Sequence, residues 1–165
     1  RPETIETSMS RFGWDSKNKI TFFDCFSYRI GTQSSSRYAI TGLSDLNQLS
    51  MIFEDLMTDV GKEKKRIVID SLSTLLLYSD PELSLKFLKN FIAIAIAQKA
   101  TILFTIEEGI HDEKTVAIVN YMVECQIEMK FDLDKRLMRI SKMRDTAISR
   151  AWLEFDIIKK GIVLL

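Results

Sequence analysis

The sequence has too few cysteine and histidine residues for the common zinc sites. Cys25 and Cys125 are far apart, and His111 is the only histidine, whereas a structural zinc ion takes about four nitrogen or sulfur ligands at close spacing. Two unpaired thiols suit a reducing compartment better than secretion. We therefore expect a cytoplasmic protein without a zinc centre of this kind.

Long hydrophobic runs and signal-peptide features are also missing. The longest apolar run, Phe91–Ala97, is far shorter than the roughly 20 residues that a membrane-spanning helix needs. We expect no membrane partner. The chain opens with Arg1, not Met, and enters a helical pattern at once, so we expect that this start is not a natural terminus.

No excess of either charge is present. Lys+Arg and Asp+Glu both number 23, which gives a formal net charge of zero. A protein without net positive charge has no overall attraction to nucleic acid. The composition therefore gives no support to DNA binding, although it leaves local basic patches open.

Glycine-rich phosphate-binding motifs are absent. A Walker A loop needs glycine, four residues, then Gly-Lys-Ser/Thr, so that backbone amides and the lysine surround the phosphates. Of the six glycines only Gly61 precedes a lysine, and Glu63 stands where a hydroxyl is required. We expect these 165 residues to be unable to hold a triphosphate by themselves, and to be inactive alone.

Helical and strand patterns alternate along the chain, which is long enough for one domain over residues 1–165. The spacing of apolar residues predicts helices over 2–12, 45–60 with Ser44 as N-cap, 72–78, 82–99 and 112–123. It predicts strands over 20–23, 67–70, 101–106, 126–131, 136–141 and 152–158. This order predicts an α/β fold with a mainly parallel sheet flanked by helices and an antiparallel hairpin extension near the C-terminus.

The predicted strand at 67–70 ends in a carboxylate. Residues 67–69 are apolar without alternation, which is typical of a strand covered on both faces, and Asp70 follows at the carboxyl end, where α/β sheets bind ligands. There Asp70 could hold Mg²⁺ through water, with Ser71 or Ser73 orienting a phosphate or a water. Residue type alone supports equally well a role of Asp70 as the cap of the next helix.

Three further sets of polar residues have open interpretations. Glu107 and Glu108 follow the next strand and could activate a water or help hold a cation, or be solvated. His111 is better explained as a surface loop residue than as a titrating group in a cleft. Lys142 and Arg144 end a hairpin strand and could reach an anion, including one held by a neighbouring subunit; a lysine that protects an edge strand is the alternative.

Four segments, in their order along the chain, resemble the RecA superfamily and, within it, the KaiC-like ATPases. They are Arg1–Ile5 leading to Phe12–Asp15, Arg66–Ser73, Thr101–Glu107 and Lys142–Arg144. The resemblance covers nearly the whole chain and implies a RecA-like fold. It implies that the chain begins downstream of the family's Walker A loop and paired catalytic glutamates.

The resemblance also implies a site and its ligands. Asp70 matches the Walker B position that serves Mg²⁺, and Lys142 and Arg144 match positions that contact ATP on the adjacent subunit of a homo-oligomeric ring. Asp145 departs from the pattern, because family members usually have glycine there, and Ile148 or Ser149 replaces a common histidine. Both departures weaken the expected contact between subunits.

Two functions therefore remain open. The first is an ATP-binding domain of an oligomeric ATPase whose P-loop lies on other sequence. The second is a degenerate, non-hydrolysing module that regulates or scaffolds protein partners. A DNA-binding paralogue is a third and weaker hypothesis.

Overall fold

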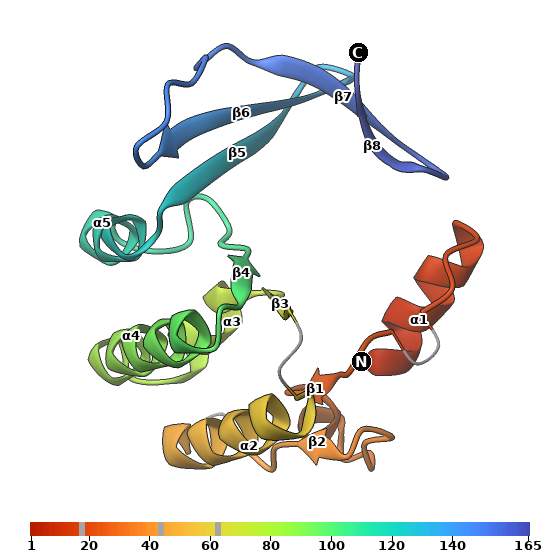
Figure 1. Cartoon of the computed structure of the whole chain (residues 1–165), viewed down its shortest axis with the longest axis vertical. Coiled ribbons are helices and arrows are strands. Elements are labelled where there is room, and N and C mark those ends of the chain that lie inside the picture. Colours follow the sequence, from red (N-terminus) through yellow and green to blue (C-terminus); the bar gives the residue numbers. More distant parts are fainter. Residues whose placement is uncertain (17–18, 43–44, 62–63) are drawn as a thin grey trace.

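Helices and strands alternate along residues 1–16, 19–42, 45–61 and 64–165, the part of the chain that the computed structural model describes (Figure 1). The helices are α1 (Pro2–Arg11), α2 (Leu46–Asp59), α3 (Leu72–Tyr78), α4 (Pro81–Ala97) and α5 (Glu113–Met122), with a 3-10 turn, η1 (Ser27–Ile30). The strands are β1 (Phe23–Asp24), β2 (Tyr38–Ala39), β3 (Arg66–Ile69), β4 (Thr101–Phe104), β5 (Cys125–Asp132), β6 (Lys135–Met143), β7 (Leu153–Ile158) and β8 (Gly161–Leu164).

Three helices begin at an aspartate whose side chain accepts a hydrogen bond from a main-chain amide of the first turn. Asp45 accepts from the main-chain amide of Gln48, Asp80 from that of Leu83 and Asp112 from that of Thr115, each over 2.9 Å. These bonds satisfy amides that have no partner within the helix. The cap predicted at Ser44 lies outside the described residues, and Asp45 is the N-cap residue of α2.

The described strands form three sheets. Strands β1 and β2 are a parallel pair, β3 and β4 are a second parallel pair, and β5-β6-β7-β8 form an antiparallel sheet. Figure 1 shows this last sheet at the top, β1, β2 and α2 at the bottom, and β3 and β4 with α3 and α4 between them. The predicted α/β class with a C-terminal antiparallel extension is confirmed.

One predicted strand lies at other residues than expected, and the short strands β2 and β8 were not predicted. The strand expected at 20–23 is the short β1, which covers Phe23–Asp24. Strand β8 was not predicted, and it pairs with β7 in a hairpin through Lys159 and Lys160. Gly161, the first residue of β8, has φ +110°, a conformation that other residues rarely adopt.

The core lies where α2, α3, α4 and α5 meet the face of β3 and β4 that they cover. One buried cluster consists of Ile40, Leu49, Leu72, Leu75, Leu76, Leu88 and Val119. A second consists of Phe53, Met57 and Phe91, with the rings of Phe53 and Phe91 stacked at 3.9 Å between centroids. These contacts fix β3 relative to α3 and therefore fix the position of Asp70.

The prediction that the strand at 67–70 is covered on both faces is wrong for the described residues. Ile67 and Ile69 pack against the second cluster, but Val68 is 65% exposed and Leu103 is 54% exposed. Successive side chains of a strand point to opposite faces, and the described helices cover one face. None of these helices has the length and hydropathy of a membrane-spanning segment.

The antiparallel sheet also has an apolar face that is partly uncovered in the described part of the chain. Cross-strand pairing places Met129 opposite Met138, and Met138 opposite Leu153. Met129 is 52% exposed and Leu153 is 47% exposed. The opposite face is polar, with Arg139 paired to Glu128. An apolar face of this kind usually packs against another segment.

Candidate functional site

The carboxyl ends of β3 and β4 bring Asp70 and Thr105 together. The hydroxyl of Thr105 donates to Asp70 Oδ1 over 3.0 Å, and the main-chain amide of Thr105 donates to the carbonyl of Ile69 over 3.1 Å. Asp70 is exposed. Its carboxylate is therefore fixed at the edge of the parallel pair at which α/β sheets bind ligands.

Asp70 is not the cap residue of α3. The N-cap position belongs to Ser71, whose side chain makes no capping hydrogen bond. The Ser71 hydroxyl lies 3.4 Å from that of Thr74. The main-chain amide of Leu72 donates to the main-chain carbonyl of Thr105 over 2.9 Å. The start of α3 is thus bound to the end of β4, and the Asp70 carboxylate keeps an open side.

Ser73 and His111 interact at the same edge. Ser73 is only 2% exposed, so it cannot orient a bound phosphate as the sequence suggested. Its hydroxyl lies 2.8 Å from His111 Nε2 and accepts from the main-chain amide of Glu107 over 3.0 Å. Hydrogen bonds from Ser73 and then Ser71 lower the pKa of Glu107.

The donor set at this edge fits hydrated magnesium. Mg²⁺ prefers oxygen ligands, keeps several waters and is usually held by one or two carboxylates together with substrate phosphates. Asp70 offers one exposed carboxylate. In the described ranges no three His, Cys, Asp or Glu side chains are grouped closely enough to hold a metal by themselves, so phosphates and waters would have to complete such a site.

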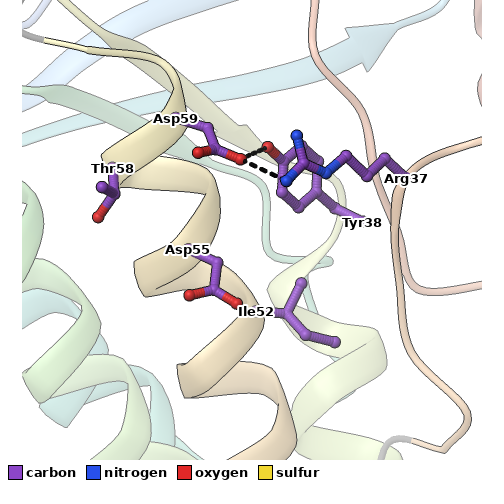
Figure 2. A pocket seen from close by; sticks show the side chains of 6 residues that line it. All are labelled: Arg37, Tyr38, Ile52, Asp55, Thr58 and Asp59. Atoms are coloured by element: carbon purple, nitrogen blue, oxygen red, sulfur yellow. Dashed lines mark hydrogen bonds and ion pairs between the residues drawn. The ribbon is translucent and has the colours of Figure 1, made fainter.

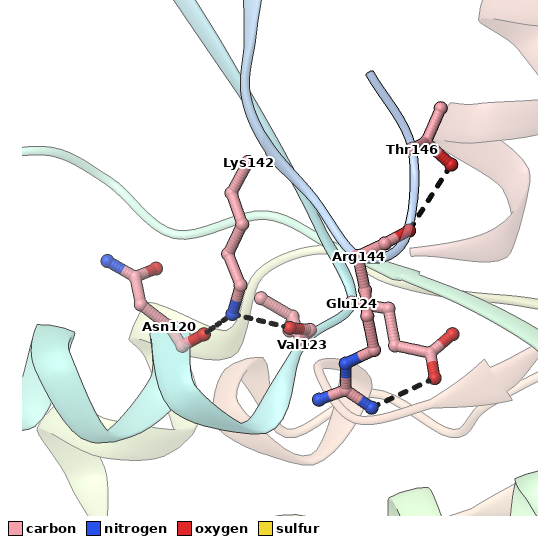
Figure 3. Close-up of polar contacts among 6 residues, drawn as sticks. All are labelled: Asn120, Val123, Glu124, Lys142, Arg144 and Thr146. Carbon is pink, nitrogen blue, oxygen red and sulfur yellow. Dashed lines mark hydrogen bonds and ion pairs between the residues drawn. The ribbon is translucent and has the colours of Figure 1, made fainter. Parts of the chain in front are cut away.

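Lys142 is engaged within its own subunit. Its ammonium group donates to the main-chain carbonyls of Asn120 over 2.6 Å and Val123 over 2.8 Å (Figure 3). These carbonyls are at the C-terminal end of α5, where a positive charge is favourable. The sequence suggested that Lys142 reaches out to an anion; the structure shows it capping α5.

Arg144 is more exposed and less firmly held. Its guanidinium lies 3.4 Å from the carboxylate of Glu124, with side-chain exposures of 56% and 73% (Figure 3). An exposed pair at this distance contributes little to stability. No hydrogen bond or ion pair of the described residues joins Lys142 or Arg144 to Asp70 or Ser71.

Asp145 occupies a left-handed backbone conformation with φ +52°. Glycine adopts this conformation at no steric cost, and aspartate is among the residues that tolerate it. The backbone at this position therefore suits the glycine that the resemblance led us to expect, and aspartate can adopt it as well.

A pocket of about 370 Å³ lies elsewhere, between α2 and β2 (Figure 2). Asp59 accepts from the Tyr38 hydroxyl over 2.6 Å and pairs with Arg37 at 3.0 Å. The hydrogen bond to Asp59 raises the pKa of Tyr38. None of the residues proposed from the sequence lines this pocket.

Asp24, a buried carboxylate at the end of β1, is not among the residues predicted from the sequence. Burial raises its pKa, but hydrogen bonds from the hydroxyls of Ser27 and Ser34, each 2.6 Å, and from two main-chain amides outweigh burial and lower it well below its usual range. The Asp-x-x-Ser spacing of Asp24 and Ser27 is the local signal that could have found it. Asp24 orders the loop that precedes β2.

Comparison with protein families identifies one match over the whole chain. The model of the family described as "ATPase: KaiC" matches residues 1–165. A UPF0273 protein of Sulfurisphaera tokodaii is 26% identical over 99% of this chain and 60% of its own length. A UPF0273 protein of Pyrococcus horikoshii is 24% identical over 99% of this chain and 69% of its own length.

A solved structure shares the fold. The crystal structure of a KaiC-like protein from Pyrococcus horikoshii matches with a TM-score of 0.69 at 21% identity, and the match covers 100% of this chain and 72% of the other. The chain thus spans 60% to 72% of the length of these three relatives.

Proposed function

Because this chain belongs to the KaiC family of ATPases, we propose that residues 1–165 are part of the ATP-binding domain of a homo-oligomeric, cytoplasmic ATPase. Asp70 holds Mg²⁺ through water, and Ser71 assists at the phosphates. A Walker A loop on sequence outside these residues binds the phosphates directly. Two free cysteines support the reducing compartment.

The position of Asp70 carries this proposal. An exposed carboxylate at the carboxyl end of a parallel strand, oriented by Thr105 from the neighbouring strand, can accept hydrogen bonds from the waters of a magnesium ion. When bound, magnesium neutralises charge on the phosphates during transfer. The role of residues 1–165 is to place and orient the Asp70 carboxylate as that hydrogen-bond acceptor.

Unpaired strand edges and an exposed apolar face in the described residues support the proposal that further sequence completes the sheet. In the described residues β4 pairs only with β3, and β5 pairs only with β6, so each strand has an edge without a strand partner. Val68 and Leu103 leave one face of the parallel pair exposed. The relatives carry additional residues outside the matched region, and such residues could cover these surfaces.

Arg144 is the residue of this chain that we assign to the nucleotide of a neighbouring subunit. Its loose contact with Glu124 leaves the guanidinium free to form a stronger, bidentate bond with a phosphate. Lys142 would first have to leave the carbonyls of α5. Of the two cations, Arg144 therefore needs less rearrangement.

A non-hydrolysing module is the second candidate function. The engagement of Lys142 with α5 favours it, as does Asp145, because a carboxylate beside Arg144 repels phosphate. Such a domain would keep the fold and the family's subunit contacts, and would act through protein partners. DNA binding has no comparable support, since the net charge is zero.

Calorimetric titration of the longest natural form of the protein with ATP tests the proposed role of Asp70. We expect Asp70→Asn to weaken binding in the presence of Mg²⁺ and to leave binding in EDTA unchanged. Asp134→Asn, in the exposed hairpin turn, is the matched control. Equal magnesium-dependent binding by Asp70→Asn and the parent protein would remove Asp70 from the site.

Turnover tests the contact between subunits. Arg144→Ala should lower ATP hydrolysis and leave nucleotide binding within the same subunit intact. A protein that binds Mg-ATP but shows no turnover before any substitution supports the non-hydrolysing module. Normal turnover by Arg144→Ala would refute the proposed role of Arg144.

A further inference from the structure

The end of strand β6 is bonded to the end of helix α5 through a side chain and through the main chain. Lys142 Nζ donates to the main-chain carbonyls of Asn120 over 2.6 Å and Val123 over 2.8 Å (Figure 3). The main-chain amide of Arg144 donates to the carbonyl of Glu124 over 2.9 Å. The last residues of β6 therefore take their position from the chain at the end of α5.

Helix α5 is a firm support for this strand end. At its start, the Asp112 carboxylate accepts from the main-chain amide of Thr115 over 2.9 Å and from its hydroxyl over 2.8 Å. Val119, next to the bonded carbonyl of Asn120, is 1% exposed and belongs to the first core cluster. These contacts hold α5 independently of Lys142, so the helix positions the strand end.

The two carbonyls are favourable partners for the ammonium group of Lys142. Carbonyls at the end of a helix lack an amide partner within it and carry its negative partial charge. Hydrogen bonds from a charged donor are roughly twice as strong as those between neutral groups. To reach a phosphate on another subunit, Lys142 would have to break both bonds, so the net gain from such a contact would be small.

Arg144 combines a fixed main chain with an open side chain. Its amide is bonded to Glu124, and its carbonyl accepts from the Thr146 hydroxyl over 3.2 Å. Its guanidinium is 3.4 Å from the Glu124 carboxylate, and the side chain is 56% exposed. The guanidinium can therefore turn to a phosphate without movement of the main chain, which lowers the ordering cost of that contact.

We propose that Lys142 is a positioning residue for Arg144, and that its ammonium stays on the carbonyls of α5 when nucleotide is bound. By holding the end of β6, Lys142 fixes the point from which Arg144 reaches the nucleotide of the neighbouring subunit. This inference rests on the proposed function, from which it takes that contact of Arg144. It departs from the resemblance, which implies that both side chains contact ATP.

Chemical labelling of the parent protein tests where the ammonium lies. Acetic anhydride acetylates free amines, and mass spectrometry of the digested full-length protein gives the rate at each lysine. Lys142 should react more slowly than Lys130, an exposed lysine of β5 that lies over the Trp152 ring. Mg²⁺ with a non-hydrolysable ATP analogue should leave the ratio of the two rates unchanged. Equal rates without nucleotide, or protection of Lys142 by the analogue, would overturn the proposal.

Turnover of single and double variants tests the link to Arg144. Lys142→Met should lower kcat about ten-fold, the equivalent of one hydrogen bond to a charged group. Because Lys142 acts through Arg144, the double variant with Arg144→Ala should be no slower than Arg144→Ala alone. Lys130→Met is the matched control and should keep normal turnover. The turnover that remains in Asp70→Asn is subtracted as background from other sites.

Two results of this cycle contradict the positioning role. A multiplicative loss in the double variant would mean that Lys142 acts on the phosphates itself. Normal turnover of a folded Lys142→Met protein would mean that Lys142 only caps α5. If Lys142→Met does not fold, Lys142→Gln, which keeps an uncharged donor, replaces it in the cycle.

Failure of the proposed function gives a different pattern. If the parent protein shows no turnover, or Arg144→Ala turns over normally, the contact with the neighbouring nucleotide fails and the positioning role fails with it. Slow labelling of Lys142 would then still establish its place on α5. If Arg144→Ala lowers turnover but Lys142→Met does not, the proposed function stands and only the positioning role is lost.

Discussion

Lys142 Nζ donates to the main-chain carbonyl of Asn120 over 2.6 Å, and this bond holds the end of β6 on the last turn of α5. We predict that Lys142→Met lowers the free energy of unfolding by about 1 to 2 kcal/mol, because two helix carbonyls lose a charged donor. Arg144→Ala should change it by less than about 0.5 kcal/mol. Urea unfolding of both variants measures the difference, and equal losses would contradict the capping role.

Asp145 should be replaceable by glycine with a gain in stability. Its φ of +52° is unfavourable for side chains with a Cβ, so Asp145→Gly should raise the free energy of unfolding by up to about 1 kcal/mol. Asp145→Val should lower it, because branched side chains are the least suited to this conformation. Thermal unfolding gives the order of stability of the parent and the two variants. An Asp145→Gly variant less stable than the parent would contradict the predicted backbone effect.

Cys25 and Cys125 should differ sharply toward alkylating reagents. Burial, followed by the negative charge of Asp24, raises the pKa of Cys25 to about 12, and the thiolate is the reactive form. Cys125 is exposed. We expect iodoacetamide at pH 8 to modify Cys125 first and Cys25 only on unfolding, as mass spectrometry of digested protein can show. Rapid labelling of the folded Cys125→Ser variant would contradict this.

The Asp24 carboxylate should make stability dependent on acid pH. Its pKa is lowered in the folded state, so its contribution is present above the unfolded value of about 3.9 and is lost as the pH falls further. Asp24→Asn should cost about 2 kcal/mol at pH 7 and flatten the fall in stability below pH 4. Denaturant unfolding at pH 7 and pH 3 measures both, with Asp134→Asn as control; a parallel acid response of Asp24→Asn and the parent would exclude this role.

Local sequence determined much of the secondary structure. Aspartate before a helical pattern fixed the starts of α4 and α5, because the capping bond is made within one turn. The apolar run before Asp70 identified β3, and the two runs around residues 132–135 identified the hairpin of β5 and β6. Strand β8 was not predicted, because the short apolar segment that follows Lys159 and Lys160 has too few residues to show a strand pattern.

What each polar side chain contacts was decided by tertiary structure. Sequence order placed Asp70 at a strand end, but only the pairing of β3 with β4 brought Thr105 to its carboxylate. Ser73 became a buried partner of His111, and Lys142 a cap of α5, because helix packing brought residues distant in sequence within hydrogen-bonding distance. The sequence pattern indicates periodicity and local capping. It does not indicate which donor bonds to which distant acceptor, because that depends on how the helices and strands pack.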